Sequence, residues 1–270
     1  MSNNPDLEGM DASSKTVLQK AMEKYLGHYS YMYRHRASKC LCTFMEHLLN
    51  AGATCDQSDL NSVLHSALER QHFSLMTAAV KRGADLFNKK NGKGVLHRCW
   101  PRAFYDEVGL SSMLEECIEY IKTHKQLGGC LDEVDDMGNT PLLAYVKSGM
   151  YTKGKECEDL SDEVVALLAT SKDVVCKADV ANVSPLHITA SRGRLNSMKI
   201  LVNKGADLFS KDNVENSCLH NCLSSEEGHL HVVDMVRYIL ENEISPNEEN
   251  KRHETALFLI IQRSEYHTGR

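Results

Sequence analysis

One stretch of the chain, residues 179–212, constrains the possible folds more than any other. Ser184 suits the position before a helix, because its hydroxyl can accept a hydrogen bond from a free amide of the first turn. Pro185 suits the first helical position, where its missing amide hydrogen is not needed and its fixed φ is already helical. The pattern therefore predicts a short helix from Pro185 to about Arg192, ended by Gly193.

A second helix is expected directly after the first, from about Leu195 to Lys204. Leu195, Met198 and Leu201 are spaced as an apolar helical stripe and not as the alternation of a strand. Gly205 then supplies a left-handed residue after the helix. Two short helices cannot bury their apolar faces by themselves, so a unit of this kind is stable only when it is stacked against others.

The same pattern recurs along almost the whole chain. The residues that take the place of His187 in successive units are Gln19, His65, His97, Leu143, His187, His220 and Phe258. The steps between them are 46, 32, 46, 44, 33 and 38 residues. This pattern resembles the ankyrin repeat, a helix–turn–helix unit with a period of about 33 residues. The resemblance implies an all-α fold, an ankyrin-repeat solenoid of stacked units with β-turn or hairpin connections.

The repeat pattern divides the chain into three parts. We expect residues 1–13 to be disordered, residues 14–262 to form the ankyrin-repeat domain, and residues 263–270 to be the C-terminal tail of a fragment. The expected units are 14–58, 59–90, 91–135, 136–178, 179–212, 213–249 and a partial unit at 250–262. The last unit lacks a recognisable second helix, which would leave its apolar residues half covered. We therefore expect a longer protein or a partner at this end, with an irregular cap formed by Gln262 to Arg270 as the alternative.

Three units are about a dozen residues longer than the family period. The motif positions place the extra residues between the two helices of each long unit, near 27–38, 100–111 and 148–160. Because insertions at the same place in a solenoid emerge on the same side, we expect three long loops along one edge. The expected starts of the second helices in these units are Cys40, Ser111 or Ser112, and Asp162.

Several residues have structural roles that the resemblance implies. The histidines of the repeat motif would hydrogen-bond to backbone between neighbouring turns, the prolines would begin helices, and the glycines would end them. These residues are His65, His97, His187, His220, Pro141, Pro185, Gly83 and Gly205. A catalytic or metal-binding role for the histidines is the alternative.

Two inserts and the turns between repeats carry the candidate partner-binding residues, because aromatic and arginine side chains dominate protein interfaces. The candidates are Trp100, Arg102, Phe104 and Tyr105 in the third unit, Tyr31, Tyr33 and Arg34 in the first insert, and Lys89, Lys90, Lys211, Asn213 and Glu215 at turn tips. For the aromatic residues, packing onto the solenoid is the alternative, with phosphorylation as a further one in the first insert. For the tips, the alternative is ordinary surface charge.

Composition and motifs argue against several functions. The formal net charge of −6 and the pI of about 6.1 argue against a nucleic-acid backbone as the main ligand, since phosphate binding needs a concentrated basic surface. No phosphate loop, nucleophile elbow, zinc-protease motif or kinase signature occurs, so we expect no catalysis and no cofactor. Cys218, His220 and Cys222 lie close together but fall short of the ligands that zinc requires, so we expect no metal.

The ten cysteines lack the spacing of a disulfide framework, so we expect reduced thiols in a cytoplasmic or nuclear protein. The chain does not open on a signal peptide, and its densest apolar run, Ala256 to Ile261, is too short to span a bilayer. We therefore expect no membrane insertion.

These features favour a non-catalytic protein–protein interaction module that binds a partner protein through turn tips and inserted loops, as a scaffold in signalling or regulation. One alternative is a protein similar to the ankyrin-type inhibitors of NF-κB, which would regulate a transcription factor; repeat number and acidity are the shared features. Another is the regulatory arm of a larger enzyme or channel. Ankyrin architecture serves all three, so the fold by itself does not choose between them.

Overall fold

A computed structural model describes residues 16–27, 37–87, 89, 92–100, 107–148, 154–224 and 232–268. Over these ranges the chain is helical and contains no β-strand, and an isolated antiparallel bridge joins Glu249 and Thr255. The all-α fold expected from the sequence is therefore confirmed. The segment 1–13, expected to be disordered, lies outside these ranges.

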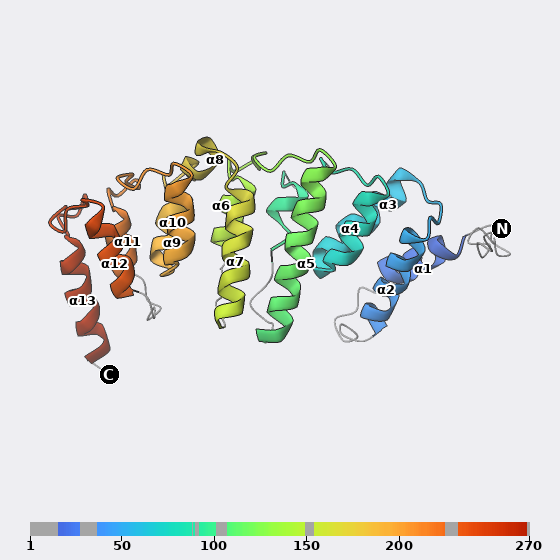
Figure 1. The fold of residues 1–270 in the computed structure, drawn as a ribbon, viewed down its shortest axis with the longest axis horizontal. Helices are drawn as coiled ribbons and strands as arrows, with labels where there is room; N and C mark the ends of the chain where they lie inside the picture. Colours follow the sequence, from blue (N-terminus) through green and yellow to red (C-terminus); the bar gives the residue numbers. More distant parts are fainter. Residues whose placement is uncertain are drawn as a thin grey trace. The chain divides into compact units, whose positions relative to one another are not determined.

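The chain forms two compact units. The first comprises residues 1–101 and 115–130, and the second comprises residues 102–114 and 131–270. The first unit contains α1 (Val17–Gly27), α2 (Ala37–Asn50), α3 (Gln57–Arg70), α4 (Phe73–Lys81), the short 3-10 helix η2 (Val95–His97) and the C-terminal part of α5 (Glu107–Gln126) (Figure 1). The second unit contains the N-terminal part of α5, α6 (Pro141–Lys147), α7 (Lys155–Leu168), α8 (Lys172–Cys176), α9 (Pro185–Ser191), α10 (Leu195–Asn203), α11 (Cys218–Ser224), α12 (Val232–Glu241) and α13 (Ala256–Thr268).

In the second unit, the first helices of successive repeats pack side by side. α9 lies between α6 and α11, and α11 lies between α9 and α13 (Figure 1). α10 packs against α9 and α7, and α12 packs against α11. The core between these helices is built from fully shielded side chains such as Leu142, Val165, Ala190, Leu201 and Met235. Stacking thus buries the apolar faces that one helix pair could not bury alone.

The first unit is built in the same way. α3 packs against α1 and α4, and α2 packs against α1 and α4. Its core includes the fully buried side chains of Leu49, Leu64, Phe73, Met76 and Tyr120.

α9 and α10 form where the sequence predicts them. Ser184 precedes α9, with its Oγ 2.9 Å from His187 Nδ1, and Pro185 is the first helical residue. Gly193 and Gly205 follow the two helices with φ of 67° and 94°. This left-handed conformation is free of steric strain for glycine, which explains why the helices end there.

The second helices of the three long units begin earlier than the sequence suggested. α2 begins at Ala37, α5 at Glu107 and α7 at Lys155. As a result α2 and α7 have 14 residues and α5 has 20, whereas α4 and α10 have 9. Part of each insert therefore lengthens a helix, whose backbone groups pair with one another. The remaining insert residues, 28–36, 101–106 and 149–153, and their predicted common edge lie outside the described residues.

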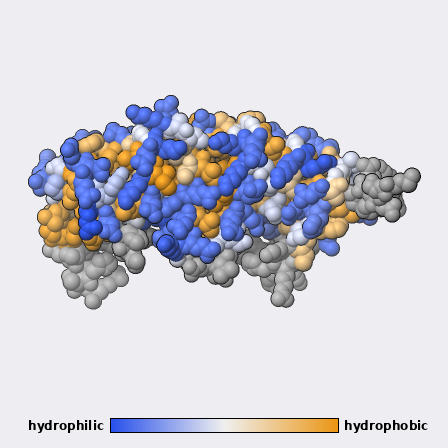
Figure 2. Space-filling model, viewed as in Figure 1, coloured by the Kyte–Doolittle hydropathy of each residue, from blue (hydrophilic) through white to orange (hydrophobic). Residues whose placement is uncertain are grey.

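The C-terminal helix α13 runs to Thr268, so residues 263–268 continue a helix where a tail or an irregular cap was expected. Its exposed apolar side chains are Leu257, Phe258, Ile260 and Ile261, at 62, 48, 40 and 51% exposure. They account for the hydrophobic patch beside the C-terminal end in Figure 2. Among the described residues, no other helix covers this face in the way that α11 covers α9.

Candidate binding surface

A buried histidine joins two neighbouring turns of the second unit. His187 Nδ1 accepts a hydrogen bond from the amide of Ser184 (3.1 Å), and its Nε2–H donates to the carbonyl of Ser210 (3.0 Å). The residue is 1% exposed, and this burial lowers the pKa of His187 below its ordinary value. The neutral ring therefore carries its proton on Nε2, and both nitrogens are occupied by backbone contacts.

His220 repeats this arrangement one unit later. Its Nδ1 accepts from the amide of Ser217 (3.2 Å), and its Nε2–H donates to the carbonyl of Glu254 (3.1 Å). The nearby thiols of Cys218 and Cys222 are buried, and burial raises the pKa of Cys222 to about 12. Within the described ranges, no group of three or more His, Cys, Asp or Glu side chains could hold a metal ion.

All ten cysteines are free thiols, and we expect them to react in two classes. The exposed thiols are Cys40, Cys130 and Cys176, with Cys55 half-buried, and the buried ones are Cys42, Cys99, Cys117, Cys157, Cys218 and Cys222. The buried thiols should react only after unfolding, because burial keeps the reagent away from the sulfur. Titration with an aromatic disulfide reagent, with and without guanidinium, measures both classes. Equal reaction rates for all ten thiols in the folded protein would contradict this expectation.

Four turns of the second unit fold in the same way. In each, one side-chain oxygen accepts the amides two and four residues later, as Asp179 does from Ala181 and Val183, both at 2.9 Å. The residues that do this are Asp135, Asp179, Asp212 and Asn250. Sequence reasoning missed them, although the signal is visible: each stands six positions before the first residue of α6, α9, α11 or α13. Such local bonds are typical of aspartate and asparagine in turns.

Neighbouring tips are also bonded to one another. The side-chain amide of Asn182 donates to the carbonyl of Lys211 (2.5 Å). In return, the backbone amide of Asn213 donates to the carbonyl of Ala181 (3.0 Å), and its side-chain amide donates to the carbonyl of Val180 (3.1 Å). These bonds fix the two tips relative to each other.

The predicted tip residues take part in similar contacts with the following tip. Lys211 pairs with Glu248 at 3.3 Å, and Glu215 lies 3.9 Å from Lys251, whose Nζ donates to the carbonyl of Asn213 (2.9 Å). Exposed ion pairs of this kind stabilise a fold by about 1 kcal/mol at most. Partner binding by Lys211, Asn213 and Glu215, and by the exposed Lys89 of the first unit, stays a prediction.

Trp100 packs within the first unit. Its side chain is 5% exposed, and its carbonyl accepts a hydrogen bond from the side-chain amide of Gln71. In the structure this side chain is therefore packed inside the first unit, as the alternative to partner binding supposed. The other aromatic and basic candidates, Arg102, Phe104, Tyr105, Tyr31, Tyr33, Arg34 and Lys90, lie outside the described residues.

Large apolar side chains stand exposed at turn tips of the second unit. Met137, Val180 and Phe209 are 58, 81 and 57% exposed. The turn before Phe209 is held by the Asp207 carboxylate, which accepts the Phe209 amide at 3.0 Å. Met137 and Val180 each lie within two residues of a turn-forming aspartate, a position that sequence reasoning had not singled out.

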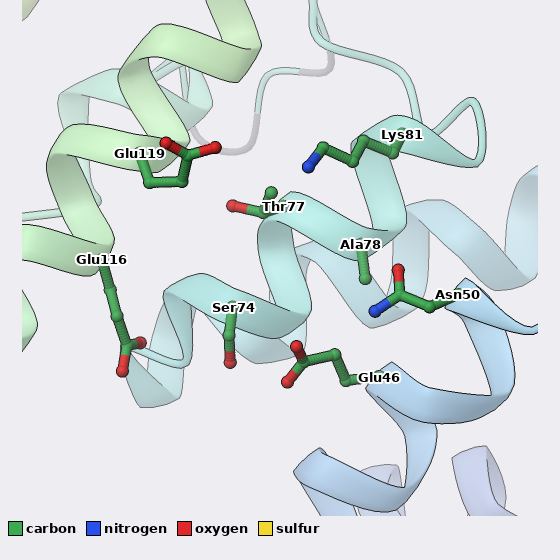
Figure 3. A pocket seen from close by; sticks show the side chains of 8 residues that line it. All are labelled: Glu46, Asn50, Ser74, Thr77, Ala78, Lys81, Glu116 and Glu119. Atoms are coloured by element: carbon green, nitrogen blue, oxygen red, sulfur yellow. The ribbon is translucent and has the colours of Figure 1, made fainter.

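A polar hollow of about 250 Å³ lies in the first unit. α2 contributes Glu46 and Asn50, α4 contributes Ser74, Thr77, Ala78 and Lys81, and α5 contributes Glu116 and Glu119 (Figure 3). The meeting of the α5 glutamates with α2 and α4 depends on packing and is not visible in the sequence pattern.

No helix in the described part of the chain is long and apolar enough to cross a membrane.

Comparisons with known proteins agree with this architecture. Residues 156–250 match the family model described as ankyrin repeats (3 copies). A crystal structure of the ankyrin repeat protein EF0377 shares the fold, with a TM-score of 0.55 at 13% identity over 79% of this chain and 95% of that one. The putative E3 ubiquitin-protein ligase XBAT34 of Arabidopsis thaliana is 28% identical over 129 residues, which are 47% of this chain and 31% of that protein. The match thus spans about a third of the length of that curated relative.

Stacked helix pairs whose turns are linked by buried histidines define a helical repeat solenoid. The match over residues 156–250 supports the ankyrin repeat family, and the solved ankyrin repeat structure shares the fold. Ankyrin repeats indicate a protein–protein interaction module.

Proposed function

We propose that this chain is a non-catalytic interaction module that binds a partner protein across the turn tips of its second unit, in signalling or regulation in the cytoplasm or nucleus. The observation that carries the proposal is Val180, which is 81% exposed on a tip whose backbone is fixed by hydrogen bonds. Phe209 and Met137 add exposed apolar surface at other tips of the same unit.

The fixed backbone matters because binding costs free energy whenever it orders a loop. The Asp179 carboxylate holds the tip that carries Val180, and the bonds of Asn213 tie it to the next tip. A partner therefore meets apolar side chains that are already in place. Burying apolar surface contributes roughly 25 cal/mol for each Å² removed from water, so these side chains would contribute to the free energy of binding.

The proposal is tested by affinity capture from cell lysate with the wild-type chain and with a Val180→Ser, Phe209→Ser variant. Val233→Ser is the matched control, because Val233 is also apolar and 70% exposed but lies on α12 and not on a tip. A partner that is lost with the tip variant and kept with the control supports the proposal. Capture of the same partners by all three chains would contradict it.

A second candidate is that the chain is the regulatory arm of a longer protein, such as an enzyme. The similarity to part of a putative ubiquitin ligase favours it, as does the exposed apolar face of α13. In that case a further helix pair of the same protein would cover α13. An antibody against residues 179–212 tests this on cell extract, because the 270-residue chain has a mass of 30.3 kDa. A single band at that mass would exclude the longer protein.

A further inference from the structure

We propose that the hollow between α2, α4 and α5 of the first unit binds an arginine side chain presented by a basic segment of a partner protein. This site lies in the first unit, so it does not depend on the turn-tip proposal for the second unit.

The first argument is charge. Three carboxylates line the hollow, from Glu46, Glu116 and Glu119, against one ammonium group, from Lys81. The formal charge of the lining is therefore −2. Glu46 and Glu119 make no ion pair or hydrogen bond with another described residue, so their charge is not compensated there. These two carboxylates attract a cation.

The second argument is a hydroxyl of the lining that makes no hydrogen bond with the described part of the chain. Thr77 is 8% exposed, and its hydroxyl makes no hydrogen bond with any described residue. Figure 3 shows this hydroxyl directed into the hollow, toward the side where α5 carries Glu119. A threonine in a helix commonly bonds to a carbonyl of the preceding turn, as Thr189 does to Leu186 at 2.9 Å. The Thr77 oxygen is therefore available to accept a hydrogen bond from a ligand that donates one.

The third argument is the fit of the ligand. Small-molecule pockets have volumes of about 300–1,000 Å³ and are mostly apolar. This hollow is smaller, at about 250 Å³, and its lining is mostly polar, so it suits the end of one side chain. The three carboxylates do not form a group that could hold a metal ion. A guanidinium carries five N–H donors in a rigid plane and can reach several separate acceptors at once, whereas an ammonium is a compact point charge.

The positive charge of Lys81 in the lining gives a prediction of opposite sign. In Figure 3 its ammonium and the Glu119 carboxylate extend toward each other over the hollow, from α4 and α5. A bound guanidinium would be repelled by this ammonium. Removing the Lys81 charge should therefore strengthen binding, whereas removing a carboxylate should weaken it.

The test is an NMR titration of the full chain with the blocked tripeptide acetyl-Gly-Arg-Gly-amide, with the neutral isostere citrulline in place of arginine as the control ligand. The readout is the dissociation constant obtained from the amide shifts of Ser74, Thr77 and Ala78. We expect saturable shifts with the arginine peptide, with affinity falling as salt is raised. Equal shifts with the citrulline peptide, or none with either peptide, would overturn the proposal.

Variants separate this site from general acidic attraction. Glu46→Gln and Glu119→Gln should each weaken binding roughly fivefold, and Lys81→Gln should strengthen it by a similar factor. Thr77→Val should also weaken binding while leaving the thermal midpoint unchanged or higher, because the lost hydroxyl has no partner in the fold. Glu115→Gln is the matched control, an exposed glutamate on α5 outside the lining. Equal weakening by Glu115→Gln and Glu119→Gln would refute a specific site.

Discussion

Replacing Asp162 by alanine is expected to lower the free energy of unfolding by about 3 kcal/mol. Asp162 on α7 is 9% exposed, and its Oδ1 lies 3.6 Å from the guanidinium of Arg194, which is 6% exposed. The hydroxyl of Ser197 on α10 donates to the same oxygen. Removing the carboxylate would leave a buried guanidinium without its counter-ion, and a buried charge without a partner is strongly destabilising. Urea unfolding followed by circular dichroism measures the loss.

Two controls test this explanation. Asp159→Ala removes an exposed aspartate from the same helix and should change stability by less than about 0.5 kcal/mol. The double variant Asp162→Ala, Arg194→Met should lose less stability than the two single variants added together, because it removes the charge along with its partner. If Asp162→Ala were as stable as Asp159→Ala, the buried pair would not hold α7 and α10 together.

The second large effect is expected at His187. The alanine variant should lose about 3 kcal/mol, because the amide of Ser184 and the carbonyl of Ser210 would both lose their partner, and each unsatisfied buried group costs about 1–3 kcal/mol. His253→Asn is the matched control: His253 is an exposed tip histidine with φ of 58°, a conformation that asparagine tolerates. Urea unfolding at pH 7.5 compares the three chains.

The pH dependence gives an independent readout. Burial lowers the pKa of His187 below its ordinary value of 6.5, so the folded chain keeps the ring neutral while the unfolded chain binds a proton as the pH falls below 6.5. Stability from this residue is therefore present above pH 6.5 and is lost below it. The decline in stability between about pH 6.5 and 5 should be smaller in His187→Gln, which does not titrate. An unchanged pH profile would show that His187 is not the group responsible.

Local signals in the sequence account for the parts of the fold that were predicted correctly. A cap residue, a proline and a closing glycine lie within a few positions of one another around α9, and their effect on the backbone does not depend on distant residues. The starts of α5 and α7 were placed too late because no such signal marks them. Their first turns form on residues that the repeat pattern assigned to loops, and packing against neighbouring helices favours such extensions.

The candidate sites depended more on tertiary structure. Tryptophan is a residue type that is common in interfaces, but Trp100 is buried in the first unit. Burial cannot be read from residue type alone. Val180 was overlooked because a single valine in a turn is unremarkable until its neighbours are seen to fix its backbone. The unpartnered hydroxyl of Thr77 is likewise visible only once the surroundings of α4 are known.

The sequence by itself determined the repeat and the order of helix pairs, because repeat motifs act through bonds between residues close in the chain. The tertiary structure decided what the stacked helices bring together. Glu46, Thr77 and Glu119 come from three different helices and share one hollow, and Asp162 and Arg194 pair across two repeats. Such contacts depend on the rotation and length of each packed helix, and these are set by the fit of whole side-chain surfaces and not by any local pattern.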